Sequence, residues 1–180
     1  MYTAKQFQFG ALTGISQKQL EVHIKLYEGY VKFLNTLFEK QAELKQDSEK
    51  NAYALAEVTR RISFEWNGMK MHEHYFAQWE GAPSALPPTV AEKIPELKAV
   101  AMMRGIGWAV LSQDEASGNL VTHFVADHEL GQLNEARTIL AIDMWEHAYM
   151  VDYVPAEKAK YVDAVLANVN GEVIAKRLRA

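Results

Sequence analysis

The sequence predicts an α+β fold, in which an N-terminal long α-hairpin is followed by a C-terminal lobe with a three-stranded antiparallel sheet and flanking helices. Two observations support this prediction. Apolar residues in the first half recur at helical steps of three and four, and those in the second half form short strand-like runs. A proline-rich segment, 81–88, separates the two patterns. We therefore expect a helical hairpin at residues 1–84 and an α/β lobe at residues 85–180.

The first predicted helix begins after Ser16 and runs to about Gln46. Ser16 followed by Gln19 is a capping-box pattern, which is typical of a helix start. The apolar face of this helix comprises Leu20, His23, Ile24, Tyr27, Tyr30, Val31, Leu34 and Leu37. Within that face His23 is a polar group that needs a partner. A hydrogen bond to a backbone or tyrosine oxygen would satisfy it as well as a metal ion would.

The second predicted helix covers residues 52–79 and follows a polar break at 46–51. Two long helices joined by a short polar turn are typical of an antiparallel hairpin. Asn67 and His74 are seven residues apart, so we expect both on one side of the helix. His72 lies two residues from His74 and is interpreted as a surface or loop-facing residue without a metal role.

The second half of the chain alternates between helical and strand patterns. We expect a short helix at 89–101, strands at 107–113, 120–126 and 138–142, and closing helices at 156–168 and 172–178. Gly118, within residues 113–119, indicates a hairpin turn between the first two strands.

Composition narrows the classes of function. The net charge of -4 gives no support for nucleic-acid binding, and the chain has no apolar run long enough to span a membrane. The N-terminus has no apolar segment of the kind found in signal peptides, and we expect a cytoplasmic protein. The chain has no cysteine, so disulfides and thiolate ligands are excluded. Any bound metal must be held by His, Asp or Glu side chains.

The segment from Asp143 to Tyr149 (DMWEHAY) carries the strongest chemical signal. Asp143 follows the buried strand at 138–142, where a carboxylate is costly unless it is paired or metal-bound. Asp143 and His147 are four residues apart, a spacing that lets both reach one ion. The alternative is a capping aspartate beside a histidine that is hydrogen-bonded within the core.

Together with this pair, the two histidines on predicted inward faces suggest a metal site. The candidate ligands are His23, His74, Asp143 and His147. Three imidazoles and one carboxylate suit iron and manganese, and would also suit zinc. Sequence spacing alone does not establish that the four side chains converge.

The chain resembles the iron/manganese superoxide dismutase family over nearly its whole length. The most specific match is the DMWEHAY segment, which fits the family pattern D-x-W-E-H-A-[YF]. Weaker matches reinforce it by their order and spacing: Gly105-Ile106-Gly107-Trp108, Tyr30-Val31-Lys32-Phe33-Leu34-Asn35, Asn67 with His74, and Tyr161 with Asn168.

The resemblance implies a superoxide dismutase with one iron or manganese ion per chain, iron being slightly favoured. It implies the metal ligands His23, His74, Asp143 and His147, and a gate for small molecules at Tyr30. His128 stands where the family has an outer-shell glutamine. Tyr30 and His128 would relay protons and adjust the metal potential. Trp108 and Trp145 would wall the pocket. A homodimer with contacts near Glu146 and Tyr149, or a tetramer, is also implied.

Some positions depart from the family pattern. His23 precedes Tyr30 by seven residues instead of eight, a step close to two regular turns that needs no π-type turn. Glu73 replaces an asparagine that usually precedes the second-helix ligand. Because the net charge is negative, attraction of superoxide must be local. Candidate cations are Lys25, Arg60, Lys70 and Lys158.

Three other functions are weighed against dismutation. The alternative closest to it is a metal-binding family member with reduced or lost dismutase activity. A carboxylate-bridged di-iron helical oxidase would need paired Glu-x-x-His motifs, which the sequence does not supply. A metal-free helical interaction module would leave the DMWEHAY segment unexplained.

Overall fold

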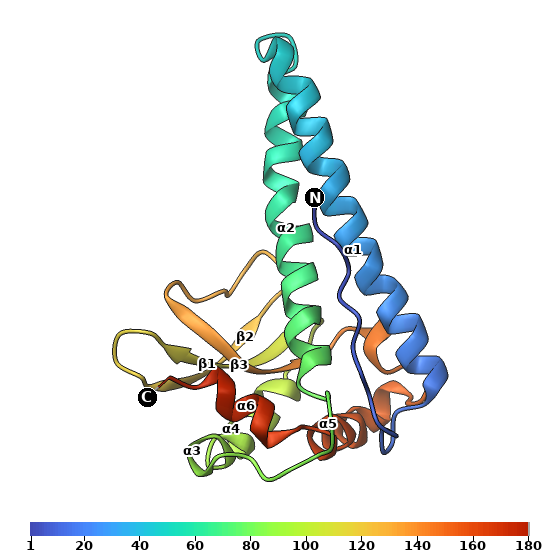
Figure 1. Cartoon of the computed structure of the whole chain (residues 1–180), viewed down its shortest axis with the longest axis vertical. Coiled ribbons are helices and arrows are strands. Elements are labelled where there is room, and N and C mark those ends of the chain that lie inside the picture. Colours follow the sequence, from blue (N-terminus) through green and yellow to red (C-terminus); the bar gives the residue numbers. More distant parts are fainter. Residues whose placement is uncertain (180) are drawn as a thin grey trace.

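The computed structural model describes residues 1–179. Helices α1 (Gln17–Leu44) and α2 (Ala52–Ala77) form the expected antiparallel hairpin, joined by the short 3-10 turn η1 (Lys45–Asp47). Figure 1 shows that one end of this hairpin projects well beyond the rest of the molecule. The Ser16 hydroxyl accepts a 3.0 Å hydrogen bond from the Gln19 backbone N–H, so the predicted start of the first helix is confirmed.

The single helix predicted at 89–101 is two helices, α3 (Pro88–Ala91) and α4 (Ile94–Ala101). Pro95 lies in the first turn of α4. A proline ring clashes with the carbonyl four residues earlier and lacks an N–H. One continuous helix would therefore place Pro95 against the carbonyl of Ala91, and the chain starts a new helix instead.

The sheet has the predicted three antiparallel strands, β1 (Trp108–Asp114), β2 (Leu120–Val125) and β3 (Ala136–Asp143), in the order β2-β1-β3. β3 is longer than predicted at its start, and Asp143 is its last residue. In the register of the sheet Asp143 lies opposite Trp108. The buried end of the sheet thus holds the carboxylate in a fixed position beside an indole.

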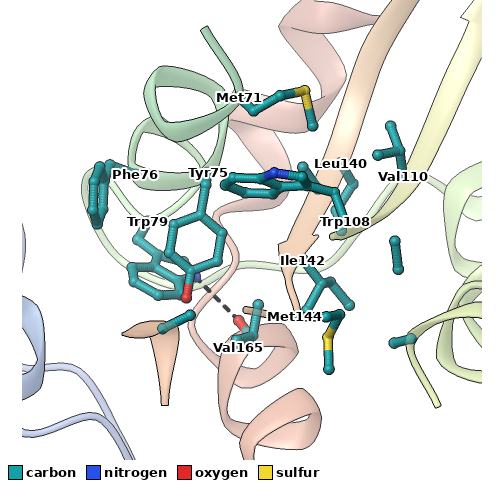
Figure 2. Packing of buried hydrophobic residues seen from close by; sticks show 14 of the residues in the cluster. Met71, Tyr75, Phe76, Trp79, Trp108, Val110, Leu140, Ile142, Met144 and Val165 are labelled. Atoms are coloured by element: carbon teal, nitrogen blue, oxygen red, sulfur yellow. Dashed lines mark hydrogen bonds between the residues drawn. The ribbon is translucent and has the colours of Figure 1, made fainter. Parts of the chain in front are cut away.

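The remaining elements are η2 (Glu146–Ala148), η3 (Pro155–Glu157), α5 (Lys158–Ala167) and α6 (Gly171–Arg177). In the view of Figure 1, α5 and α6 lie below the sheet. α5 is tied to the turn that follows α2, because the indole N–H of Trp79 donates a 3.1 Å hydrogen bond to the Val165 carbonyl, drawn as the dashed line in Figure 2. The two predicted closing helices are therefore confirmed.

One continuous cluster of buried hydrophobic side chains extends from the helical hairpin into the sheet and the closing helices. Figure 2 shows Trp108 from β1 packed beside Met71 and Tyr75 from α2. The division of the chain into two units at residue 84 stays a prediction. Among residues 1–179, none of the helices is both long enough and apolar enough to cross a membrane.

Candidate metal centre

Asp143 is fixed by its neighbours so that one carboxylate oxygen stays available. It is 0% exposed. Its Oδ1 accepts a 2.9 Å hydrogen bond from the Trp145 backbone N–H, and its carbonyl accepts a 2.7 Å hydrogen bond from the Tyr161 hydroxyl. The other oxygen, Oδ2, faces three imidazoles. A buried carboxylate held in this way requires positive charge or donors at that oxygen.

Three histidines from three elements meet at Asp143 Oδ2. The Nε2 atom of His23, from α1, lies 3.0 Å away, that of His147, from η2, lies 3.2 Å away, and that of His72, from α2, lies 3.5 Å away. One ligand atom from each of these four residues lies within 4.8 Å of the others. Three nitrogens and one oxygen at this spacing form a donor set that can surround a single ion.

The environment of His72 fits a metal ion better than a hydrogen bond. Its Nδ1 is 2.6 Å from the Gly68 carbonyl, which can only accept, so Nδ1 carries the proton. The Nε2 atom then presents a lone pair toward the Asp143 carboxylate, and it has no hydrogen-bond partner among the described residues. Two electron-rich atoms facing each other in a buried site favour a cation between them.

Burial also keeps the ligand groups in the forms that metals bind. It lowers the pKa of His23 despite the opposing hydrogen bond to Asp143, and it lowers the pKa of His72 further. Burial alone would raise the pKa of Asp143, but the charge and hydrogen bond of His147 and the hydrogen bond of His23 hold it well below its usual range. The site therefore combines imidazoles at His23 and His72 that burial keeps neutral with an ionised carboxylate at Asp143.

The prediction that paired His74 with the metal and left His72 at the surface does not match this geometry. His72 is 0% exposed and lies in the ligand group, and His74 does not. Instead, the side chain of His74 lies near Arg177, and burial together with that charge lowers its pKa to about 4. With His72 as the second-helix ligand, the residue that precedes it is Met71, so Glu73 no longer corresponds to the family asparagine.

Asn67 does not mark the side of α2 that faces the candidate ligands. Its side-chain amide donates to the His128 carbonyl at 2.6 Å. Buried residues at steps of four and three include Glu65, Met69, His72 and Phe76 of α2, and Trp79 follows two residues after the helix ends. Among them Met69, Phe76 and Trp79 are large and apolar, and their spacing selects His72.

Tyr30 and His128 form a second layer beside the ligands. The Tyr30 ring lies 5.0 Å from the ring of His72 and 5.0 Å from that of His128. α1 is α-helical throughout, as the seven-residue spacing between His23 and Tyr30 predicts. The ring of His23 also lies 5.0 Å from the ring of His72. Tyr30 and His23 therefore reach the same ligand without a wider turn.

His128 is buried with two unpaired ring nitrogens. It is 0% exposed, and neither nitrogen has a hydrogen-bond partner among residues 1–179. The indole N–H groups of Trp108 and Trp145 are unpaired too, and both rings lie close to His128, at 6.1 and 5.5 Å between centroids. Burial lowers the pKa of His128 to about 4. These groups line a region where water or a small anion would find several partners.

Gly68 is a residue of the site that sequence reasoning missed. A Cβ atom there would lie 2.5 Å from Cδ1 of Tyr30 and 3.0 Å from Nδ1 of His128. Its carbonyl also accepts the hydrogen bond from the Nδ1–H group of His72. Gly68 lies four residues before His72, and in the sequence a glycine inside a long helical pattern is the one signal that could have indicated a close approach.

Gln19 is a second missed residue, and it ties α1 to the turn that carries His147. It is 2% exposed. Its Nε2 donates to the His147 carbonyl at 2.7 Å, and its Oε1 accepts from the Val151 backbone N–H at 3.0 Å. The capping-box pattern thus marks the helix start correctly, but its glutamine side chain is used across the fold instead of returning to Ser16.

The two residues expected at a dimer contact differ in exposure. Glu146 is exposed on η2, whereas Tyr149 is only 4% exposed and packs on Tyr161, with 5.1 Å between ring centroids. Most of the Tyr149 surface is therefore already covered within its own chain.

The chain is similar to proteins of one known family. The family model described as "Iron/manganese superoxide dismutases, C-terminal domain" matches residues 90–177. A protein named superoxide dismutase [Fe] from Aquifex pyrophilus is 34% identical over 92% of this chain and 85% of its own length. Another of that name, from Cupriavidus metallidurans, is 31% identical over 94% and 91%. Superoxide dismutase [Mn] 2 from Halobacterium salinarum is 31% identical over 85% and 80%.

Proposed function

This chain belongs to the iron/manganese superoxide dismutase family, and from that premise we propose that it disproportionates superoxide at one iron or manganese ion held by His23, His72, Asp143 and His147. The observation that carries the proposal is the approach of three imidazole nitrogens to a single carboxylate oxygen in a buried site. Zinc fits the same donors but has no redox chemistry, so it would not support the reaction.

The reaction converts two superoxide anions and two protons into one oxygen molecule and one hydrogen peroxide. Iron or manganese held by these residues would supply the one-electron redox chemistry that the reaction needs. The protein must therefore provide an anionic carboxylate, which pairing maintains at Asp143, and neutral imidazoles, which burial maintains at His23 and His72. It must also admit a small anion and deliver protons.

Tyr30 and His128 are the groups proposed to control those protons. Burial and the charge of Asp143 raise the pKa of the Tyr30 phenol, so the hydroxyl keeps its proton at neutral pH. His128 stays neutral and has both a donor and an acceptor nitrogen free of other partners. A phenol and an imidazole in ring contact next to a ligand can hold and pass a proton over short distances.

Metal content and activity of matched variants test this proposal. Purified protein supplied with iron or manganese is expected to bind about one ion per chain and to dismute superoxide. His72→Ala is expected to lose the ion and the activity, whereas His74→Ala, two residues along the same helix, keeps both. Loss of metal in H74A with retention in H72A would contradict the ligand set. Bound metal without turnover in the unmodified protein would favour the alternative, a metal-binding family member with reduced activity.

Association of two or more chains and a cytoplasmic location belong to the same proposal. Support for a homodimer comes from exposed apolar side chains close to Glu146, namely Met150 at 50%, Val151 at 43% and Val154 at 56%. Sedimentation of the purified protein distinguishes monomer, dimer and tetramer, and cell fractionation tests the location.

A further inference from the structure

A surface pocket of about 350 Å³ opens between α1 and α2 directly outside Tyr30. Its lining includes Tyr30, Phe33, Arg61, Phe64 and Glu65. We propose that Arg61 attracts and transiently binds the small anionic substrate in this pocket, which is the approach to the metal centre. This inference rests on the proposed function and adds to it a residue that determines how the anion arrives.

The pocket is separated from the ligands by one layer of side chains. Tyr30 lines the pocket, and its ring is 5.0 Å from the ring of His72. Phe64 also lines the pocket, and its ring is 4.8 Å from that of His128. An anion in the pocket therefore needs to pass only these rings to reach the region lined by unpaired buried nitrogens.

The geometry of Arg61 suits an anion-binding role. Its guanidinium carbon lies 3.6 Å from the centre of the Phe64 ring, and its Nε donates a 3.0 Å hydrogen bond to Glu65 Oε1. These two contacts hold the guanidinium plane at the pocket wall. Among residues 1–179, no hydrogen bond uses its terminal Nη1 and Nη2 groups, so up to four N–H donors remain for a diatomic or triatomic anion.

Three of the cations suggested from sequence are engaged away from this pocket. Arg60 pairs with Glu57 at 2.8 Å and with Glu129 at 3.2 Å. Lys70 pairs with Glu73 at 3.1 Å, and Lys158 donates to the Met103 carbonyl at 3.2 Å. Among the described residues that line the pocket, Arg61 is the one cationic side chain. Lys25, the fourth cation suggested from sequence, is not among the lining residues, so attraction of an anion into this pocket falls to Arg61.

Adjacent arginines allow a matched test. Arg61→Gln and Arg60→Gln remove the same charge from neighbouring positions whose side chains are 41% and 56% exposed, so both variants are expected to fold. Arg61→Lys keeps the charge at the pocket. Each protein is loaded with the same metal, its metal content is measured, and azide is titrated as an anionic probe by the change in the metal absorption spectrum.

At equal metal content, R61Q is expected to bind azide about two- to fivefold more weakly than the unmodified protein, the range expected for one partly exposed charge. R60Q is expected to be unchanged, R61K to retain most of the affinity, and the R61Q deficit to shrink as salt is added. Equal affinities in R61Q and R60Q would overturn the inference, as would an R61K variant as weak as R61Q. If either of these two results is found while the unmodified protein is active, only the inference about Arg61 fails. If the unmodified protein binds no metal, the proposed function fails as well.

Discussion

Gly68→Ala tests whether the packing around the metal centre has room for one more carbon atom. The added Cβ would lie 2.5 and 2.7 Å from two carbons of the Tyr30 ring and 3.0 Å from His128 Nδ1. These contacts are shorter than van der Waals separation, so Tyr30 and His128 must both shift. Gly29→Ala is the matched control, because Gly29 is also helical and a Cβ there would have no heavy atom within 4 Å.

The two variants together isolate the cost of the clash. In each variant the helix preference of alanine raises the free energy of unfolding by about 0.5–1 kcal/mol. In G68A alone, overpacking lowers it by about 1–3 kcal/mol. The two variants should therefore differ by about 1–3 kcal/mol, which for a chain of this length corresponds to a difference of about 2–12 °C in Tm.

Thermal unfolding of both metal-free proteins measures this difference, and dismutation by the metal-loaded forms measures its effect on the site. G68A is expected to melt below G29A and to lose turnover through displaced Tyr30 and His128. If G68A melts together with G29A and keeps full turnover, the second layer is not packed as the structure describes.

Three further predictions concern neighbouring parts of the site. Gln19→Ala removes both hydrogen bonds from Gln19 to the turn that carries His147. In competition with a chelator, the variant is expected to retain metal about tenfold more weakly, the low end of the range for such a supporting contact. Unchanged retention would exclude a positioning role for Gln19. Tyr30→Phe is expected to keep the metal and alter turnover and its pH profile, and an empty site would mean that the hydroxyl is structural. His74 has its pKa lowered from 6.5 to about 4, so the unfolded chain binds its proton first and stability is lost as pH falls through that window. His74 contributes at most about 3 kcal/mol to this loss in the free energy of unfolding. Denaturant unfolding of metal-free His74→Gln should therefore show a free energy of unfolding that declines less steeply between these pH values than that of the unmodified protein. Equal slopes for the two proteins would contradict the prediction.

Much of the fold follows from local patterns in the sequence. The hairpin, the three strands and the closing helices were predicted because each depends on periodicity within one segment. The break between α3 and α4 is also local, since Pro95 forbids a continuous helix, although the apolar pattern continues across it.

The site was predictable only where its residues lie within a clear pattern. Asp143 and His147 belong to one short segment, and His23 lies in the middle of an apolar face. His72 was missed because the rotation of α2 was fixed from a polar residue. Gln19 and Gly68 could not be assigned from sequence, because their partners belong to elements 128 and 38 to 60 positions away along the chain.

The central claim is that one redox-active ion is bound by side chains from both halves of the chain. Anomalous X-ray scattering from crystals of the iron- or manganese-loaded protein tests it most directly. One peak is expected within coordination distance of Nε2 of His23, His72 and His147 and of Asp143 Oδ2. A peak at His74, or strong scattering from surface sites with none beside Asp143, would contradict the account.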